Sequence, residues 1–445
     1  MKRLLTDKLL AWKNNPEKKP LIVYGARQIG KTHTIMEFGL NNYASIAYFY
    51  FEHNYELCRI FEEGISSIAS LITKLEGHIN QQIIPGATLV FFDEIQSCPA
   101  AISCLKRFCE TAPEYHVIAA GSLLGVALRR VANNTKAQWD EKQRTYSFPV
   151  GKVDELIMYP LTFEEFLMEF NPHLIPLIRE CYNTNSTFSV GLHNQALELF
   201  LQYLVIGGMP EAILEYKKTK DYIFVRAKQL AICNNYILDM SKYTESRSES
   251  IKNEAVYNSL SSQLARQNRK FQYALVKSGA RANEYENSLA WLEKAAILIK
   301  CNRVSEGKEP LAFYEDFLAF KVYMSDVGLL AAKSNNSHLS ILGRTVGDIA
   351  MGAMTENYIA QSLKANGLKF YYWESGNNAE LDFVIQIENE IIPIEAKSWK
   401  SVRSQSLEVF RKKYNIKKSI RISAKNFGFE NGIKSVPLYA VWCIV

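Results

Sequence analysis

The first third of the chain alternates short apolar runs with more polar stretches, a pattern that predicts strands separated by helices. Runs rich in Val, Ile, Leu, Phe and Tyr occupy residues 21–24, 45–51, 89–92, 116–120 and 156–159. Runs of this kind are typical of buried strands in a parallel sheet that helices cover on both faces. We therefore expect an α/β domain at the start of the chain.

The middle of the chain has a helical pattern. From Thr162 to Tyr243 apolar residues recur at spacings of three and four, most clearly between Ala196 and Val205. The Gly-Gly-Met-Pro sequence at 207–210 predicts the end of a helix there. Thr162 and Glu165 have the spacing of a capping box, which predicts that a helix begins at this point.

Residues 253–304 predict two or three short helices, one of them with an apolar face over residues 285–299. A polar hairpin follows at 305–308. Helices followed by a hairpin are typical of a winged helix, so Lys270, Lys277 and Arg281 are candidates for contact with DNA phosphates. Winged helices also serve as protein-interaction modules, and that alternative stays open.

The last third predicts a second α/β region. A helical stretch covers residues 348–365, and an alternating strand covers 379–385. A polar turn at 388–390 and another strand at 391–397 complete a predicted hairpin.

The composition agrees with this globular picture. The chain has 445 residues, of which 48% are hydrophobic and 22% charged, so we expect two or three domains and exclude a collagen-like or wholly disordered chain. Without an apolar span or a secretory signal, we expect a cytoplasmic protein with no membrane contact. The eight Cys and seven His are scattered, which favours buried thiols over a zinc site.

The first candidate chemistry follows directly after the strand 21–24. Two glycines with four residues between them, then Lys and Thr, fit the P-loop pattern: Gly25, Ala26, Arg27, Gln28, Ile29, Gly30, Lys31 and Thr32. Glycines let the backbone curl around a phosphate, and a helix that begins near Lys31 points its free N–H groups at the anion. Lys31 is predicted to neutralise the β- and γ-phosphates of ATP, and the Thr32 hydroxyl to hold Mg²⁺.

Two adjacent carboxylates end the apolar strand 89–92. Asp93 and Glu94 are costly to bury at such a place unless they serve a purpose. In a P-loop enzyme Asp93 would reach Mg²⁺ through water, and Glu94 would polarise the attacking water and favour hydrolysis over mere binding. The alternative is a helix that simply begins at Asp93.

Ser122 follows the strand 116–120. If that strand lies between those of the P-loop and Asp93, Ser122 lies beside the γ-phosphate and is a candidate sensor, although Gly-Ser is also common turn chemistry. Arg129 and Arg130 are candidates for an arginine finger, with ordinary surface arginines as the alternative. A homo-oligomer, in which such an arginine acts in a neighbouring subunit, is compatible with these motifs.

The chain resembles prokaryotic AAA-type ATPases that combine a P-loop domain with a C-terminal domain of unknown function. The likeness extends over nearly the whole chain and is carried by residues 25–32, 89–96, 119–125, 148–167, 203–213 and 320–330, and by the hairpin 380–397. It implies ATP and Mg²⁺ as cofactors. It also makes the helices after residue 161 a lid beside the nucleotide.

The C-terminal carboxylates resemble the core of restriction-endonuclease-like nucleases. In the predicted hairpin Asp382 and Glu395 come side by side, and Glu395 and Lys397 share a face. By resemblance Glu356, Asp382 and Glu395 are metal ligands and Lys397 is the catalytic cation, with Mg²⁺ activating water for phosphodiester cleavage. The alternatives are a surface hairpin with ordinary Glu–Lys pairs and a nuclease fold that binds DNA without cutting it.

A strongly basic segment begins at the end of this hairpin and continues after it. Between Glu395 and Lys425 ten basic residues stand against two acidic ones, an excess of +8 within a net charge of +6 for the whole chain. Such an excess attracts polyanions, although a charge run is often only a solvated face. Together with the nuclease-like pattern, it makes DNA the expected partner.

Four domains follow from these patterns. They are a P-loop domain at 1–160, a helical lid at 161–245, a winged-helix-like domain at 246–335 and a nuclease-like α/β domain at 336–445. The leading hypothesis is a Mg²⁺-dependent, DNA-associated AAA-type ATPase with a possible C-terminal nuclease activity. The alternative is a nucleotide-dependent interaction switch whose C-terminal domain binds DNA or another partner without cleaving it.

Overall fold

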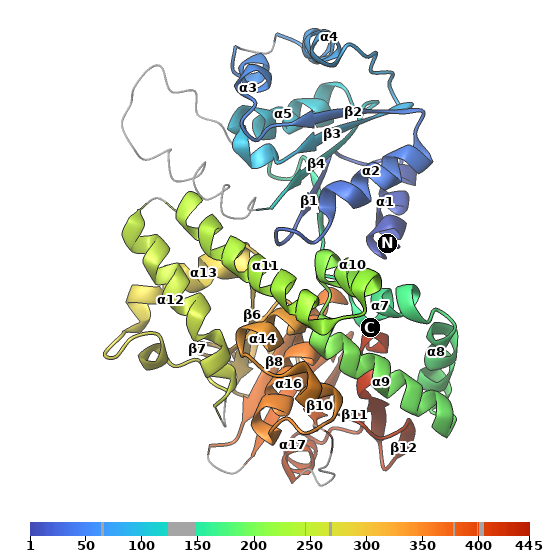
Figure 1. Cartoon of the computed structure of the whole chain (residues 1–445), viewed down its shortest axis with the longest axis vertical. Coiled ribbons are helices and arrows are strands. Elements are labelled where there is room, and N and C mark those ends of the chain that lie inside the picture. Colours follow the sequence, from blue (N-terminus) through green and yellow to red (C-terminus); the bar gives the residue numbers. More distant parts are fainter. Residues whose placement is uncertain are drawn as a thin grey trace. The chain divides into compact units, whose positions relative to one another are not determined.

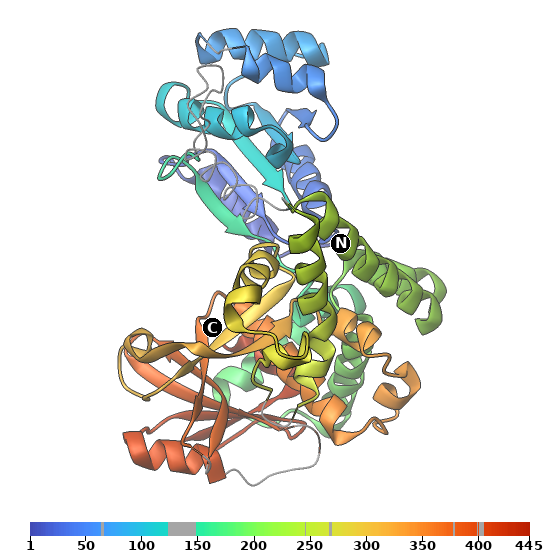
Figure 2. The same cartoon turned by 90° about the vertical axis from the view of Figure 1, so that its left-hand side faces the viewer.

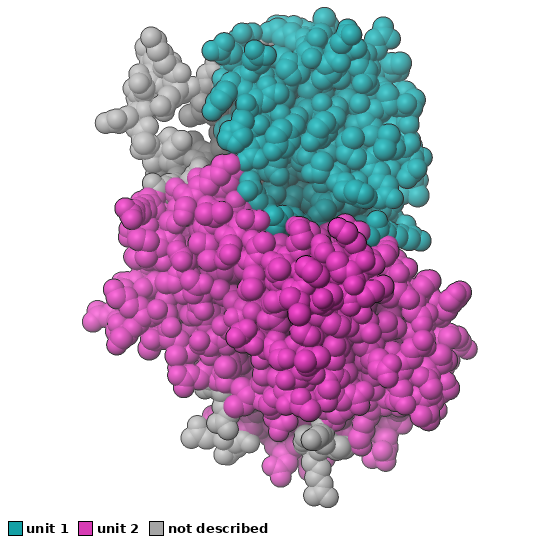
Figure 3. All heavy atoms as spheres, viewed as in Figure 1, with its two compact units in different colours: residues 1–159 teal, residues 160–445 magenta. Residues whose placement is uncertain are grey.

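The computed structural model describes residues 1–63, 66–122, 148–244, 246–266, 269–376, 379–397, 399 and 405–445. The chain divides into two compact units, Met1–Tyr159 and Pro160–Val445 (Figure 3). The candidate arginine fingers Arg129 and Arg130 lie outside the described residues.

Unit 1 is a five-stranded parallel sheet in the order β2-β3-β4-β1-β5 (Figure 1). Its strands are β1 (Leu21–Tyr24), β2 (Ser45–Tyr50), β3 (Thr88–Asp93), β4 (His116–Gly121) and β5 (Asp154–Ile157). Its helices are α1 (Leu5–Asn14), α2 (Lys31–Asn42), α3 (Tyr55–Glu62), α4 (Ile68–Ile79) and α5 (Pro99–Thr111), with a 3-10 turn at Ile95–Ser97.

Helices cover both faces of this sheet, as the apolar strands predict. Helices α3, α4 and α5 enclose a core in which Phe51, Phe61, Phe92 and Phe108 meet edge to face, while α2 packs on the opposite face. Burial on both sides explains why all six residues of β3 are buried.

The strands 21–24, 45–51, 89–92 and 116–120 are confirmed to within a residue or two, but the fifth prediction is wrong by two residues. Strand β5 begins at Asp154, where its backbone pairs with Leu21 of β1. It is an edge strand whose burial alternates along its length, so apolar character is a poor guide to its start.

Unit 2 begins with a run of helices. Thr162 caps α7 with the predicted capping box: its hydroxyl accepts from the Glu165 N–H, and the Glu165 carboxylate accepts from the Thr162 N–H. The run consists of α7 (Phe163–Phe170), α8 (Leu174–Thr184), α9 (Val190–Ile206), α10 (Pro210–Thr219), α11 (Tyr222–Lys242), α12 (Arg247–Leu264) and α13 (Ala282–Lys294), with a 3-10 turn at Tyr273–Leu275. The predicted helix end at 207–210 is confirmed.

The rest of unit 2 is built on an eight-stranded mixed sheet in the order β12-β13-β11-β10-β9-β8-β6-β7. The strands are β6 (Leu298–Val304), β7 (Glu315–Met324), β8 (Phe370–Glu374), β9 (Glu380–Ile387), β10 (Glu390–Ala396), β11 (Ser419–Ser423), β12 (Gly428–Glu430) and β13 (Ile433–Pro437). The helices are α14 (Val327–Lys333), α15 (His338–Leu342), α16 (Asp348–Ala365) and α17 (Gln405–Tyr414), with 3-10 turns at Leu311–Tyr314 and Leu438–Cys443.

The two sides of this sheet carry different elements. Figure 2 shows α17 lying against the strands, where it contacts β9 and β10 and buries Leu407 and Phe410 beside Trp373. Helix α16 contacts β6 and β7. The predicted helix 348–365 and the hairpin of β9 and β10 are both confirmed.

The helix predicted over 285–299 ends earlier than expected. Helix α13 stops at Lys294, Ala296 has a left-handed backbone with φ 56°, and Ile299 lies in strand β6. The predicted hairpin at 305–308 joins β6 to β7, but β6 also pairs in parallel with β8. The hairpin is therefore part of the C-terminal sheet, and a separate winged helix is not confirmed.

Among the described residues, no single helix is both long and apolar enough to cross a membrane. Helices α9 and α10 meet the criteria of length and composition only when taken together, and they are bent by 116° at the break between them.

The end of α9 crosses the start of α14 at very short range. A Cβ on Gly328 would lie 2.5 Å from the backbone nitrogen of Gly207. Asp326 fixes this crossing, because its carboxylate accepts from the Gly208 N–H at 2.6 Å and the Leu329 N–H at 2.9 Å. Burial raises the pKa of Asp326 to about 6, and these N–H donors oppose the shift.

We expect Gly328→Ala to destabilise unit 2 by about 3 kcal/mol, because the new methyl group meets backbone atoms that cannot move aside. Urea unfolding followed by tryptophan fluorescence would measure this. The matched control is Gly191→Ala in α9, where a Cβ meets nothing within 4 Å, so helix propensity should leave stability equal or higher. Equal stability of the two variants would contradict the close crossing.

Candidate functional site

The segment between β1 and α2 forms a tight loop at the carboxyl edge of the sheet of unit 1. Gln28 and Gly30 have left-handed backbones, with φ of 64° and 91°. Gly25 is required by space, because a Cβ there would lie 2.1 Å from the carbonyl oxygen of Met158. Helix α2 begins at Lys31, so its free N–H groups lie at the end of this loop, as predicted.

Lys31 lies inside the loop with only 6% of its surface exposed. Its ammonium group donates to the carbonyl oxygens of Gly25 at 3.1 Å and Ala26 at 2.7 Å. Burial lowers the pKa of Lys31 to about 8, and the charges of Glu94 and Asp93 oppose that shift. Within the described part of the chain, no carboxylate pairs directly with this buried cation.

Thr32 and Asp93 meet at the same edge. The Thr32 hydroxyl donates to Oδ2 of Asp93 at 2.8 Å, so the two predicted Mg²⁺-binding residues are in contact. The Tyr48 hydroxyl donates to the same oxygen at 3.0 Å, and the Glu94 N–H donates to Oδ1 at 3.0 Å. Burial raises the pKa of Asp93, and the hydrogen bond from Thr32 opposes the rise.

Glu94 and Ser122 are also brought together. Strand β4 lies between β1 and β3, which is the order that the sensor prediction required. Ser122 follows β4, and its hydroxyl donates to Oε1 of Glu94 at 3.3 Å. Gln96 donates to the other oxygen of Glu94, which itself has a left-handed backbone with φ 50°. Left-handed backbones are uncommon among non-glycine residues, and those that occur cluster at functional sites.

Three supporting residues were missed by the sequence analysis. Arg3 donates to the carbonyl oxygens of Ile29 at 2.8 Å and Tyr159 at 2.6 Å and so anchors the loop. Tyr48 and Gln96 orient Asp93 and Glu94. No pattern in the sequence indicates these contacts: those of Arg3 and Tyr48 depend on how separate elements pack, and that of Gln96 depends on the 3-10 turn that directly follows Glu94.

The residues at this edge fit a nucleotide bound with Mg²⁺. Backbone atoms come close to Gly25, which has no side chain, and the loop holds the buried ammonium group of Lys31, which donates to carbonyl oxygens of the loop itself. Hydroxyl and carboxylate oxygens, as in Thr32 and Asp93, are the hard ligands that Mg²⁺ prefers.

The C-terminal candidates are brought together in part. The ladder of β9 and β10 pairs Phe383 with Ile394, and one further step places Asp382 opposite Glu395. Oδ2 of Asp382 accepts from the Ala396 N–H at 2.9 Å, and Lys397 pairs with Oε1 of Glu395 at 2.5 Å.

Two features mark this pair of carboxylates. Strand β9 has one residue more than β8 between the pairs Tyr371–Val384 and Trp373–Leu381, a bulge that includes Asp382. Burial raises the pKa of Glu395, and Lys397 opposes the rise.

Glu356 does not join Asp382 and Glu395. It pairs instead with Arg269 and Lys321. Across the described ranges, no three His, Cys, Asp or Glu side chains are grouped so that they could hold a metal ion. Among the described residues the three predicted metal ligands are therefore not grouped together, and Glu356 has cations of the chain itself as partners.

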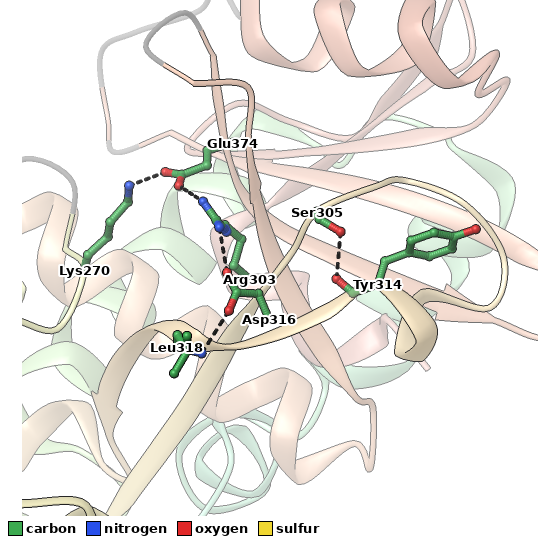
Figure 4. A network of polar contacts seen from close by, with 7 residues as sticks. All are labelled: Lys270, Arg303, Ser305, Tyr314, Asp316, Leu318 and Glu374. Atoms are coloured by element: carbon green, nitrogen blue, oxygen red, sulfur yellow. Dashed lines mark hydrogen bonds and ion pairs between the residues drawn. The ribbon is translucent and has the colours of Figure 1, made fainter. Parts of the chain in front are cut away.

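Several predicted DNA contacts are engaged within the chain. Lys270 pairs with Glu374, which Arg303 also contacts at 2.5 Å (Figure 4). In the basic segment, Lys418 pairs with Glu390 at 2.8 Å and Arg411 donates to backbone carbonyl oxygens. Among the described residues of that segment, Lys412, Lys417 and Lys425 are exposed lysines that form no ion pair, and Lys277 and Arg281 are exposed near α13.

Residues 17–167, most of unit 1, match the model of a family described as an AAA domain, which agrees with the resemblance of this region to AAA-type P-loop ATPases. Residues 197–340 and 351–441 match two families described as domains of unknown function, DUF8612 and DUF4143. The restriction-endonuclease-like character of the C-terminal region is not confirmed. No curated protein matches the chain.

Solved structures give more distant likenesses. A Walker-type ATPase of Pyrococcus abyssi is 14% identical, with 74% of this chain and 94% of that chain covered and a TM-score of 0.40. The Orc1 protein of Aeropyrum pernix in complex with DNA is 13% identical, with 76% and 92% covered and a TM-score of 0.25. AMPPCP-bound DnaA from Aquifex aeolicus is 14% identical, with 66% and 88% covered and a TM-score of 0.23. None of these likenesses assigns a function to the present chain.

We expect ATP affinity to fall as pH rises above about 8. A bound triphosphate favours the charged form of Lys31, so binding must take up a proton once the free ammonium, with its pKa of about 8, has been deprotonated. Below pH 8 the affinity should be nearly constant. Isothermal titration of ATP between about pH 7 and about pH 9.5 would measure the slope. This range extends about one unit or more to either side of the Lys31 pKa.

The control for this titration is Lys31→Arg, since arginine stays charged over the whole pH range. If that variant binds ATP, its affinity should not depend on pH. A wild-type affinity that does not change between pH 7 and 9.5 would contradict the assigned role of Lys31.

Proposed function

We propose that unit 1 binds ATP together with Mg²⁺ and hydrolyses it. The observation that carries this proposal is the contact of Thr32 with Asp93 at 2.8 Å, next to the buried ammonium of Lys31. These residues come from the loop after β1 and the end of β3, which parallel strands bring to one edge. The AAA domain match to residues 17–167 supports the same activity.

Lys31 and the loop before it would bind the phosphates. The backbone of residues 25–32 and the N-terminus of α2 offer N–H donors, and Lys31 would exchange its carbonyl partners for the β- and γ-phosphate oxygens. Because Lys31 is desolvated, its attraction to an anion is stronger than that of a surface lysine.

Thr32 and Asp93 would hold the metal ion. When bound, Mg²⁺ supplies charge neutralisation between the β- and γ-phosphates. Tyr48 and the Glu94 N–H hold the Asp93 carboxylate in place, so its orientation is set before any ligand arrives.

Glu94 would orient and polarise the water that attacks the γ-phosphate. Ser122 and Gln96 contact its two oxygens and fix the carboxylate toward the edge of the sheet. Ser122, at the end of the strand between β1 and β3, would report on the γ-phosphate through the same contact. Arg129 or Arg130 of a neighbouring subunit remains a proposed arginine finger.

We expect Glu94→Gln to keep ATP binding and to lower the rate of hydrolysis by about 10²–10⁴-fold, because the amide cannot act as a base. Phosphate release at saturating ATP and titration calorimetry would measure the two properties separately. The control is Glu63→Gln, an exposed residue paired with Lys74 at 3.3 Å, which should leave both unchanged. Wild-type hydrolysis in the Glu94 variant would contradict the assignment.

A second candidate function is association of the C-terminal region with DNA. Its support is the set of exposed lysines Lys412, Lys417 and Lys425 in a segment that follows the Asp382–Glu395–Lys397 group. Cleavage of DNA by that group is the stronger form of this proposal. Asp382 accepts from the backbone beside Glu395, whereas Glu356 pairs with Arg269 and Lys321, and this difference supports binding without cleavage over cleavage.

We expect DNA binding, if phosphate contacts carry it, to weaken steeply with salt and to lose about 0.9 in the slope of log affinity against log salt for each lysine removed. Filter binding or anisotropy with the triple Gln variant of Lys412, Lys417 and Lys425 would measure this. The matched control is Lys418→Gln, whose lysine is already paired with Glu390. Absence of binding at low salt would contradict the proposal.

The same protein tests cleavage. Linear, supercoiled and single-stranded DNA would be incubated with Mg²⁺ or Mn²⁺, with and without ATP, and compared with Asp382→Ala. Cutting that disappears in the variant would identify an ATP-linked nuclease. Binding without cutting would identify the nucleotide-dependent switch.

A further inference from the structure

A short segment of unit 2 pairs with β7, the edge strand of the eight-stranded sheet. Residues 269–271 run beside β7, where Lys270 forms an antiparallel bridge with Lys321. The Phe271 N–H donates to the Phe320 carbonyl at 2.9 Å, and the two rings stack at 5.3 Å. We call residues 269–271 the strap.

Two basic residues of the strap form ion pairs with carboxylates of β8 and α16. Lys270 pairs with Glu374, which Arg303 links to Asp316 (Figure 4). Arg269 pairs through Nη1 with Oε1 of Glu356. The strap is therefore held by charge as well as by its backbone.

The guanidinium group of Arg269 reaches Glu356 through the space beside Gly352. A Cβ on Gly352, one helical turn before Glu356, would lie 2.6 Å from Nη2 of Arg269. The guanidinium therefore occupies the space that a side chain at position 352 would fill. Only 17% of the Arg269 side chain and 4% of the Glu356 side chain are exposed.

Lys321 supplies a second buried cation to the same cluster. Only 1% of its side chain is exposed, and its ammonium lies 2.5 Å from Oε1 of Glu380 and 3.9 Å from Oε2 of Glu356. It also lies 5.1 Å from the centre of the Tyr372 ring. The Tyr323 hydroxyl donates to Oε2 of Glu356 at 3.2 Å, so both oxygens of that carboxylate have partners.

The charges of this cluster balance without an added ion. Two carboxylates, Glu356 and Glu380, face two cations, Arg269 and Lys321. A divalent ion at Glu356 would have to displace a buried guanidinium and leave it without a counter-charge, which is strongly unfavourable. The residues around Glu356 therefore do not fit the metal that the nuclease resemblance implies.

We propose that Arg269 and Lys321 are the resident counter-ions of Glu356 and Glu380, forming an ionic site that needs no metal and that fixes the strap to the sheet. The predicted carboxylate set is thereby split in two. Glu356 belongs to the strap, and only Asp382 and Glu395 remain as oxygen ligands beside Lys397. This inference is independent of the ATP site, and it limits the second candidate function to that smaller group.

The first test is Mn²⁺ binding by the full-length, nucleotide-free chain, measured by electron paramagnetic resonance. We expect Glu356→Gln to bind the same amount of Mn²⁺ as wild type, whether that amount is zero or not. Mn²⁺ that is bound by wild type and lost in Glu356→Gln, with the circular dichroism spectrum unchanged, would overturn the proposal.

An Asp382→Asn variant separates this proposal from the proposed cleavage of DNA. Mn²⁺ lost only in Asp382→Asn agrees with the counter-ion assignment and leaves cleavage possible. Failure of every form to bind Mn²⁺ also agrees with the assignment, while it removes the basis for metal-dependent cleavage.

The second test measures the coupling between Arg269 and Glu356 and needs no metal. Urea midpoints would be compared for Arg269→Gln, Glu356→Gln and the double variant. We expect each single change to lower the midpoint, because it leaves a buried charge without its partner. We expect the second change to lower the midpoint much less once the first is made, because it removes the charge that had lost its partner. Additive losses would overturn the proposal, and Lys418→Gln serves as a control with an exposed pair.

Discussion

The need to give every buried charge a partner shapes both units of this chain. Lys31 and Asp93 are buried at the edge of the first sheet, and Asp326 and Lys321 are buried in the second unit. Each is satisfied by donors or acceptors from a different element, and isolated charges in such places would be prohibitively costly. The elements that meet at these groups are therefore fixed with respect to one another within each unit.

In unit 1 this requirement and the parallel topology produce the site together. Parallel strands end at one edge, and the order β3-β4-β1 places the residues after three strands side by side. The sequence analysis could predict this because the P-loop pattern, the Asp93–Glu94 pair and Ser122 each follow an apolar run. It could not predict Arg3 or Tyr48, whose contacts depend on the packing of separate elements, or Gln96, whose contact depends on the turn after Glu94.

In unit 2 the sequence analysis predicted the local elements better than their grouping. The helix that carries Glu356 and the hairpin of Asp382 and Glu395 were placed correctly. The partner of Glu356 was not, because Arg269 is distant in sequence and reaches it only through the strap and the gap at Gly352. The spacing of carboxylates along the sequence indicates which helix or hairpin carries them, but not which of them form ion pairs with basic residues elsewhere in the chain.

The parallel pairing of β6 with β8 has a consequence for dissecting the chain. A fragment that ends near residue 335 would contain β6 and β7 without their neighbour, and one that begins there would expose the edge of β8. Unpaired edges of this kind promote aggregation. Truncation of the gene at that point would therefore favour aggregation of the pieces, whereas a single polypeptide keeps β6 paired with β8.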